Sequence, residues 1–233
     1  MNAHYFVSDA HIGGANPDAE QRLFRFLESI RGRAKSLYVL GDLFEFWFEY
    51  GRAIPRQGFR ALAELAELSR TGTRIGYLKG NHDFRFKDFW PRELGAVAAD
   101  ELDVTLDGKR VYLAHGDALD TALVPRVFRA LMHSRFNGWL YSLLHPDIGI
   151  GLALAVAQAS RVNGVKPSLL ADMAGFAENR LESGFDVVIM GHSHVPELRR
   201  FDGGVYMNVG DWLTHFTYGV IRDGQPSLEV FEE

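Results

Sequence analysis

The first hundred residues alternate between short apolar runs and longer segments in which apolar residues recur at helical spacing. This pattern predicts three buried strands and two amphipathic helices, in the order strand 4–8, helix 17–31, strand 37–40, helix 59–70 and strand 74–79. Asn16 and Pro17 suit the start of the first helix, because proline is tolerated in a first helical turn. The densely aromatic stretch 43–50 follows neither periodicity, and we assign no element to it.

Beyond residue 100 the pattern changes from strand–helix alternation to hairpins. It predicts a buried strand at 186–190 and three hairpins, which pair 102–106 with 110–114, 197–201 with 205–208 and 217–221 with 228–231. The dipeptide Asp107-Gly108 is a strong two-residue turn signal. We find no repeat and no linker. We therefore expect one α/β domain, 1–233, with two mixed sheets packed face to face, helices outside, and a helical insertion at about 120–166.

Composition narrows the class of protein. With 47% hydrophobic residues over 233 positions, the chain can bury a sizeable core, and the absence of cysteine excludes disulfides, thiolate zinc sites and cysteine nucleophiles. The first residues lack the basic and apolar regions of a signal peptide, and the longest apolar run, 148–159, is too short to span a bilayer. We therefore expect a cytoplasmic protein. The net charge of −5 argues against nucleic acid as a partner.

Polar clusters follow the predicted strands at the points where ligands bind in open α/β sheets. They are Asp9-Ala-His11, Gly41-Asp42, Gly80-Asn-His-Asp83, His115-Gly-Asp117 and Gly191-His-Ser-His194. Imidazole, carboxylate and amide oxygen together suit Mn²⁺, Fe²⁺ or Zn²⁺, and the number of ligands favours two ions over one structural zinc. Asp42 is the natural bridge, because its two oxygens can hold both ions. Any one of these histidines alone would more often be a core or surface residue, but together they predict a metal site.

These ordered clusters resemble those of the calcineurin-like metallophosphoesterases. The resemblance implies a four-layer αββα sandwich with a two-metal site. Residue by residue, it implies one ion held by Asp9, His11, Asp42 and His194, and a second held by Asp42, Asn81, His115 and His192. One departure is Glu45, which stands where many relatives have aspartate; that position is usually outside the ligand set.

Within that superfamily the sequence is similar to the UDP-2,3-diacylglucosamine hydrolase family of lipid A synthesis. The similarity lies in the segments 41–50, 115–117, 144–151 and 208–212. It implies a metal-dependent phosphoric anhydride hydrolase, with two divalent ions, Mn²⁺ in the first place, that cleaves a nucleotide–lipid into UMP and 2,3-diacylglucosamine 1-phosphate. It also implies peripheral association with the anionic cytoplasmic face of the inner membrane, and no protein partner is evident.

His82 and Asp83 are the candidate catalytic residues. We expect His82, oriented by Asp83, to stabilise or protonate the leaving group once attack has begun. The alternative is that His82 serves only to position Asn81.

The predicted insertion combines basic and apolar residues. Residues 121–166 carry five basic residues against one acidic residue, a local balance of +4, together with many leucine and aromatic side chains. We interpret the mixture as an amphipathic lid that accepts acyl chains and meets phosphates or anionic headgroups; a packed helical hairpin is the alternative. The candidate substrate-binding residues are Asn81, Ser160, Arg161, Asn163 and Lys166.

Two other functions compete with this one. A phosphodiesterase, pyrophosphatase or nuclease of the same superfamily could act on a soluble nucleotide, although the net negative charge and the apolar insertion weigh against a nuclease. A phosphoesterase fold could also serve as a non-catalytic binding scaffold. Such a scaffold should lack metal ligands, whereas every predicted ligand is present here.

Overall fold

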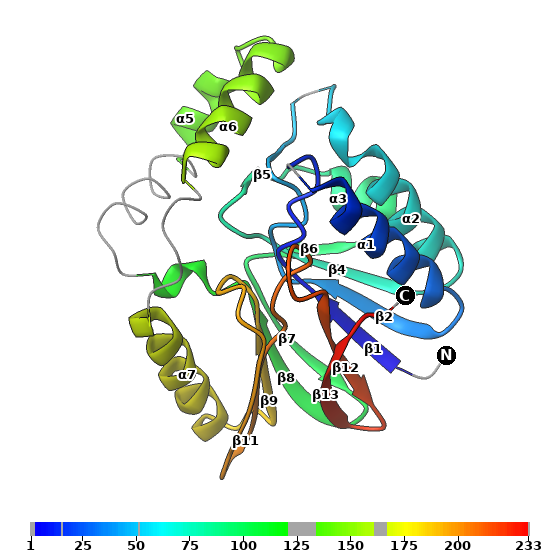
Figure 1. Cartoon of the computed structure of the whole chain (residues 1–233), viewed down its shortest axis with the longest axis vertical. Helices are drawn as coiled ribbons and strands as arrows, with labels where there is room; N and C mark the ends of the chain where they lie inside the picture. The colour runs from blue at the N-terminus through cyan, green and yellow to red at the C-terminus, as the bar shows by residue number, and fades with distance from the viewer. Residues whose placement is uncertain (1–2, 15, 51, 121–133, 161–166, 233) are drawn as a thin grey trace.

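The apolar runs of the sequence form the central strands of two sheets that face one another, and helices cover the outer face of each (Figure 1). The structure, a computed structural model, describes residues 3–14, 16–50, 52–120, 134–160 and 167–232. The molecule has four layers, helix, sheet, sheet and helix, and one apolar cluster fills the space between each layer and the next. This arrangement confirms the predicted αββα fold class.

The six-stranded sheet has the order β13-β12-β1-β2-β4-β6. Its strands are β1 (Ala3–Val7), β2 (Ala34–Val39), β4 (Arg74–Leu78), β6 (Val97–Ala99), β12 (Thr217–Arg222) and β13 (Gln225–Val230). The first four pair in parallel, whereas β12 and β13 are antiparallel. The outer face packs against α1 (Pro17–Ser29), α2 (Phe59–Arg70) and α3 (Phe89–Leu94), and the short η1 (Arg56–Gly58) leads into α2. Asn16 caps α1 as expected, since its side-chain oxygen accepts from the Ala19 N–H at 3.2 Å.

The five-stranded sheet has the order β10-β11-β9-β8-β7. Its strands are β7 (Glu101–Leu106), β8 (Lys109–Ala114), β9 (Val187–Met190), β10 (Glu197–Phe201) and β11 (Gly204–Asn208). Parallel β8, β9 and β11 form the centre, and antiparallel β7 and β10 form the edges. The short η2 (Asp117–Leu119) follows β8, and α7 (Pro167–Glu182) covers the outer face.

Strand periodicity explains why these central runs are apolar throughout. In β9, Val187 and Ile189 face the other sheet, whereas Val188 and Met190 face α7. Successive side chains of a strand point to opposite faces, and both faces of this sheet are covered. The two sheets therefore pack between layers of helices, and this packing fixes the positions of the strand ends.

The aromatic stretch 43–50 has an irregular pattern because it is buried on two sides. Phe44 and Trp47 pack into the core under α1 and α2, whereas Phe46, Phe48 and Tyr50 form a separate cluster. The stretch contains β3 (Trp47–Phe48), which pairs in parallel with β5 (Asp83–Arg85).

Two helices of the predicted insertion pack on this separate aromatic cluster. They are α5 (Arg135–Tyr141) and α6 (Pro146–Ser160), and Figure 1 shows them beyond the ends of both sheets. Within the described residues, no helix is both long and apolar enough to cross a membrane.

The last hairpin differs from its prediction. Its second arm begins at Gln225 rather than Leu228, because Asp223 and Gly224 both have left-handed backbones, with φ of 51° and 74°, and form a two-residue turn. The sequence prediction also missed β3, β5, α3 and β6, each of six residues or fewer.

Candidate metal centre

The loops that carry the predicted ligands meet at one edge of the sandwich. Parallel β1, β2 and β4 end at the same edge of their sheet, as do β8 and β9 of the other. Two contacts join the sheets there: the His192 N–H donates to Asp9 Oδ2 at 2.9 Å, and His115 Nδ1 donates to the Leu40 carbonyl at 2.7 Å. Residues that are up to 183 positions apart in sequence therefore share one site.

The backbone at this edge is strained. Five of the predicted ligands have left-handed φ values although none is glycine: Asp9 (54°), His11 (47°), Asp42 (52°), His192 (66°) and His194 (57°). Such conformations persist only where the surroundings over-determine them, and they are typical of functional sites. The motif glycines allow this close approach, since a Cβ on Gly80 would lie 2.8 Å from Asp42 Cγ.

Asp9, His11 and His194 form one group with ligand geometry. Each offers an atom within 4.8 Å of the others, and His194 Nε2 lies 3.4 Å from Asp9 Oδ1. The two imidazole rings stack with their centroids 5.3 Å apart. Asp9 Oδ1 and both ring nitrogens of His11 are buried, and none of them forms a hydrogen bond within the part of the chain that the structure describes. Buried polar atoms without partners are costly, so this group fits a cation well.

Asp42 belongs to two further groups of the same kind. One joins it to Asp9 and His115, and the other joins it to His11 and His82. His115 Nε2 lies 3.4 Å from Asp42 Oδ2 and 3.2 Å from Asn81 Oδ1, with the ring of His192 beside it at 4.9 Å between centroids. Asp42 therefore occupies the central position that a bridging carboxylate needs.

The pKa shifts show where charge is favoured in this cluster. Burial acts to raise the pKa of Asp42, but the charges of His115 and His82 outweigh it and hold that pKa well below its usual range. Burial lowers the pKa of His11, and burial together with the charge of His115 lowers the pKa of His192 to about 4. For His115, burial acts to lower the pKa, but the charge of Asp42 and its contact with the ring outweigh burial and raise that pKa well above its usual range. Burial is likewise outweighed at His194, whose pKa is raised by Asp9 and Asp211. A bound divalent ion would replace the protons on these two rings, because a ligating imidazole must be neutral.

The pairing expected between His82 and Asp83 is wrong. The ring Nδ1 of His82 donates instead to the Glu45 carbonyl at 2.8 Å. Asp83 accepts from the N–H groups of Asp42 (3.1 Å) and Gly80 (2.9 Å), so it ties the loops after β2 and β4 together. Burial, with the charge of Asp42, raises the pKa of Asp83 to about 7. The physical reason is that His82 lies in a turn while Asp83 begins β5, and the buried Asp83 carboxylate is already occupied by two backbone N–H groups and by the Tyr77 hydroxyl, which donates at 3.0 Å.

Two acidic residues outside the predicted ligand set touch its histidines. Glu45 Oε2 lies 3.4 Å from His11 Nδ1, and Asp211 Oδ2 lies 3.4 Å from His194 Nδ1. Asp211 was missed by the sequence reasoning. Its only sequence signal is its place in the segment 208–212, which the family resemblance had marked without giving it a role.

Most of the predicted substrate-binding side chains lie outside the described residues. Asn81 lies in the site, beside His115. Ser160 ends α6, but its side chain and the whole of Arg161, Asn163 and Lys166 lie outside the described residues. The α5–α6 pair is tied to the site through Arg85, which donates to the Gly138 carbonyl at 2.9 Å.

The α5–α6 pair also presents a large apolar surface. Its exposed apolar side chains are Phe136, Trp139, Leu140, Leu143, Leu144, Ile148 and Leu152. Large exposed apolar patches mark surfaces that bind other molecules or membranes.

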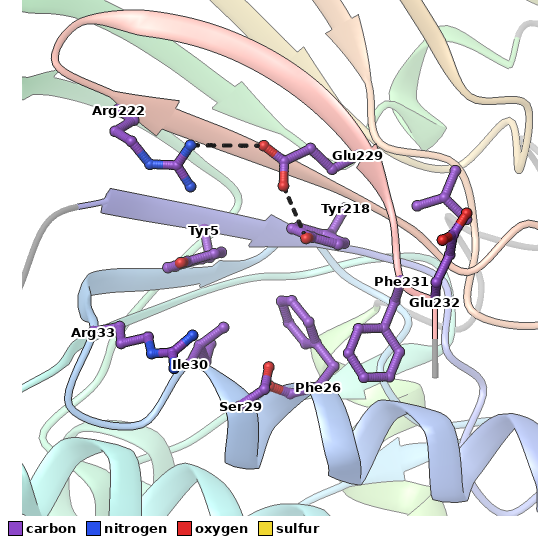
Figure 2. Close-up of a pocket in the computed structure, with 11 residues that line it drawn as sticks. Tyr5, Phe26, Ser29, Ile30, Arg33, Tyr218, Arg222, Glu229, Phe231 and Glu232 are labelled. Atoms are coloured by element: carbon purple, nitrogen blue, oxygen red, sulfur yellow. Dashed lines mark hydrogen bonds and ion pairs between the residues drawn. The ribbon is translucent and has the colours of Figure 1, made fainter.

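A cavity of about 390 Å³ lies elsewhere, between α1, β1, β12 and β13 (Figure 2). Its walls include Phe26, Arg33, Tyr218 and Arg222, and Figure 2 shows Glu229 bound to both Tyr218 and Arg222. No predicted site residue lines it, so we do not interpret it as the catalytic site.

Comparisons with known proteins agree with this geometry. Residues 5–196 match the family model described as calcineurin-like phosphoesterase. The chain is 34% identical to the UDP-2,3-diacylglucosamine hydrolase of Porphyromonas gingivalis over 98% of this chain and 97% of that protein. It is 33% identical to the enzyme of the same name from Aeromonas salmonicida, over 96% and 91%. An archaeal phosphodiesterase of known structure shares the fold, with a TM-score of 0.53, 16% identity, and coverage of 98% and 99%.

Proposed function

The chain belongs to the calcineurin-like phosphoesterase family, and we propose that it hydrolyses the pyrophosphate bond of UDP-2,3-diacylglucosamine to UMP and 2,3-diacylglucosamine 1-phosphate. The observation that carries this proposal is the convergence of the five polar clusters on one edge of the sandwich, in a chain similar along nearly its whole length to enzymes of that name.

The ligand set that we propose divides between two divalent ions. Asp9, His11 and His194 would hold one, Asn81, His115 and His192 would hold the other, and Asp42 would contact both. When bound, such ions activate water and neutralise charge on the attacked phosphate group. We propose Mn²⁺ in the first place, with Fe²⁺ or Zn²⁺ as alternatives, because the donors are nitrogen and oxygen without thiolate.

His82 is the residue that we propose to act on the leaving group. Because its Nδ1 donates to the Glu45 carbonyl, that nitrogen carries a proton and Nε2 is left for the substrate. A second proton on Nε2 would stabilise the leaving oxygen as its bond to phosphorus breaks. Asp83 contributes by fixing the loops rather than by touching His82.

We propose that the α5–α6 pair binds the acyl chains. Trp139 and Leu143 are 53% and 64% exposed, whereas most apolar side chains of the sandwich are buried. Each methylene transferred from water to such a surface contributes about 0.8 kcal/mol. Chains of ordinary length would therefore dominate substrate affinity, while Ser160, Arg161, Asn163 and Lys166 remain our candidates for the diphosphate.

The test compares substrates that share the diphosphate but differ in the chains. With Mn²⁺, kcat/KM for the diacyl substrate should exceed that for UDP-glucose by several orders of magnitude. Trp139→Ser with Leu143→Ser should lower the first value at least tenfold and leave the second unchanged. Val230→Ser, at an apolar residue that is 57% exposed on β13, is the matched control and should change neither. Comparable values for the two substrates would instead support an enzyme of soluble nucleotides.

We also propose that the protein associates peripherally with the anionic cytoplasmic face of the inner membrane. The exposed apolar surface of α5 and α6 supports this, as do the exposed arginines 52, 56 and 60, which follow in sequence Tyr50 of the aromatic cluster on which those helices pack. Flotation with vesicles that contain anionic lipid should show binding that weakens as salt increases. Equal binding to neutral vesicles would contradict the electrostatic part of the proposal.

A further inference from the structure

Asp211 contacts two histidines from the loop between β11 and β12. Its Oδ2 lies 3.4 Å from His194 Nδ1 and 3.4 Å from His215 Nδ1, and the residue is 3% exposed. His194 belongs to the candidate ligand group, whereas His215 is a partly exposed residue that no predicted cluster includes.

The loop holds Asp211 in one orientation. Its Oδ1 accepts from three backbone N–H groups, those of Leu213, Thr214 and His215, at 3.1, 2.8 and 2.9 Å. With one oxygen fixed in this way, the other is directed at the imidazole nitrogens. The next residue anchors the loop to the site itself, since the Trp212 N–H donates to the Asp9 carbonyl at 3.2 Å.

This contact selects a tautomer of His194. A carboxylate can only accept, so a neutral His194 ring that binds an ion through Nε2 turns its remaining N–H, on Nδ1, toward Asp211. The lone pair is then on Nε2, which lies 3.4 Å from Asp9 Oδ1 inside the ligand group. His11 is placed in a similar way: its Nδ1 lies 3.4 Å from Glu45 Oε2, and its Nε2 lies 3.9 Å from Asp9 Oδ1. Each ring of the stacked pair therefore lies between an outer carboxylate and Asp9.

We infer that Asp211 is a positioning residue that fixes the tautomer and orientation of His194 for metal binding, an inference that rests on the proposed metal centre. Replacing a carboxylate that accepts a hydrogen bond from a ligating histidine typically lowers metal affinity 10- to 100-fold. Loss of the carboxylate should therefore weaken one ion by that factor and leave the other nearly unchanged.

The test substitutes Asp211→Asn, which retains an oxygen for the three backbone donors but presents an amide N–H₂ to His194. Mn²⁺ is titrated into the metal-free protein, with Asp186→Asn as the matched control. Asp186 also accepts a backbone N–H, from Arg110 at 2.8 Å, but it precedes β9 at the end away from the site. We expect two ions in the wild type and in the control, and one ion bound 10- to 100-fold more weakly in Asp211→Asn.

Two further measurements separate positioning from simple damage. Nitrogen-15 shifts of the His194 ring, recorded in the metal-free protein at a pH high enough for the ring to be neutral, should show the Nδ1–H tautomer in the wild type and its loss in Asp211→Asn. Activity of the variant should return at saturating Mn²⁺, which misfolding would not allow. Unchanged affinity for both ions, or an unchanged tautomer, would overturn the inference. A wild type that binds fewer than two ions would overturn the metal centre itself, and the tautomer measurement distinguishes the two failures.

Discussion

His82→Ala separates the two roles that the geometry leaves open for this residue. The ring donates to the Glu45 carbonyl, whereas the backbone N–H of His82 donates to Asp42 Oδ1 at 2.8 Å. Truncating the ring therefore leaves the contact that holds Asp42 in place. If His82 acts on the leaving group, the chemical step should slow while the bound metal stays.

The expected magnitudes distinguish a catalytic role of His82 from an effect of the substitution on folding stability. General acid help contributes about 10²–10⁴-fold in rate, which corresponds to about 2.7–5.5 kcal/mol of activation free energy. The structural effect is the loss of one hydrogen bond, about 1 kcal/mol, which lowers the Tm of a chain of this size by about 2–4 °C. A hundredfold loss of kcat at moderate temperature cannot arise from so small a destabilisation.

The assay measures kcat with Mn²⁺ for phosphodiesters that carry either a p-nitrophenyl or an unsubstituted phenyl leaving group, with metal content determined on the same samples. The loss should be larger for the phenyl ester, because its leaving oxygen needs more stabilisation. His4→Ala is the control, since His4 is a buried histidine whose Nδ1 lies 2.7 Å from Ser36 Oγ in another part of the sheet. Loss of metal in His82→Ala would instead make His82 a ligand beside His11 and Asp42, and equal losses for both esters would refute the leaving-group role.

Three other predictions concern the site and its support. Reconstitution of the chelated protein should give two ions per chain at full activity, and Asp42→Ala should disturb both; one ion at full activity would contradict the bridging role. In urea denaturation, Gly191→Ala should lower the free energy of unfolding by about 1–3 kcal/mol, because its Cβ would overlap the buried side chain of Ser8. Gly151→Ala should be neutral or slightly stabilising, because its Cβ would meet no atom of the described residues within 4 Å. In the metal-free protein, folded Asp83 keeps its proton up to about pH 7, whereas the unfolded chain releases it near pH 4. The free energy of unfolding, measured relative to that of Asp83→Asn, should therefore fall as the pH rises across this window, by at most about 1.4 kcal/mol per pH unit. A difference that stays flat or rises with pH would contradict the buried proton.

The sequence predicts the framework of the site well because each element there obeys one simple rule. The runs at β1, β2, β4 and β9 are apolar on both faces, so they can only be central strands of a covered sheet. A polar cluster directly after such a run must lie at a sheet edge. Parallel pairing then brings those clusters together without any further information.

Elements that depend on distant partners are not predictable in this way. Phe46 and Phe48 bury against Tyr141, about ninety residues later, so their spacing in sequence follows no single surface. The sequence predicts the insertion that contains α6 to be helical, but Ile148 and Leu152 are exposed while Ile150 and Leu154 pack inward. Apolar residues on both sides of the helix therefore conceal which face is buried.

The roles of carboxylates were the hardest to predict. Asp83 stands next to His82 in the chain and yet binds backbone N–H groups, whereas Asp211 is 17 residues from His194 and touches it. A carboxylate's function follows from which donors the fold places around it. Composition and spacing do not contain that information.

The position of the ligands across two sheets has a mechanical consequence. Asp9 and Asp42 come from the six-stranded sheet, whereas His115, His192 and His194 come from the five-stranded sheet. A divalent ion held by both sets acts as a cross-link between the halves of the sandwich, closing loops that run through most of the chain. Any unfolding route in which the sheets separate must first release the ion. Occupancy at one hundred times the dissociation constant would then contribute about 2.7 kcal/mol to the folded state, so ions that serve the proposed reaction would also hold the two sheets together.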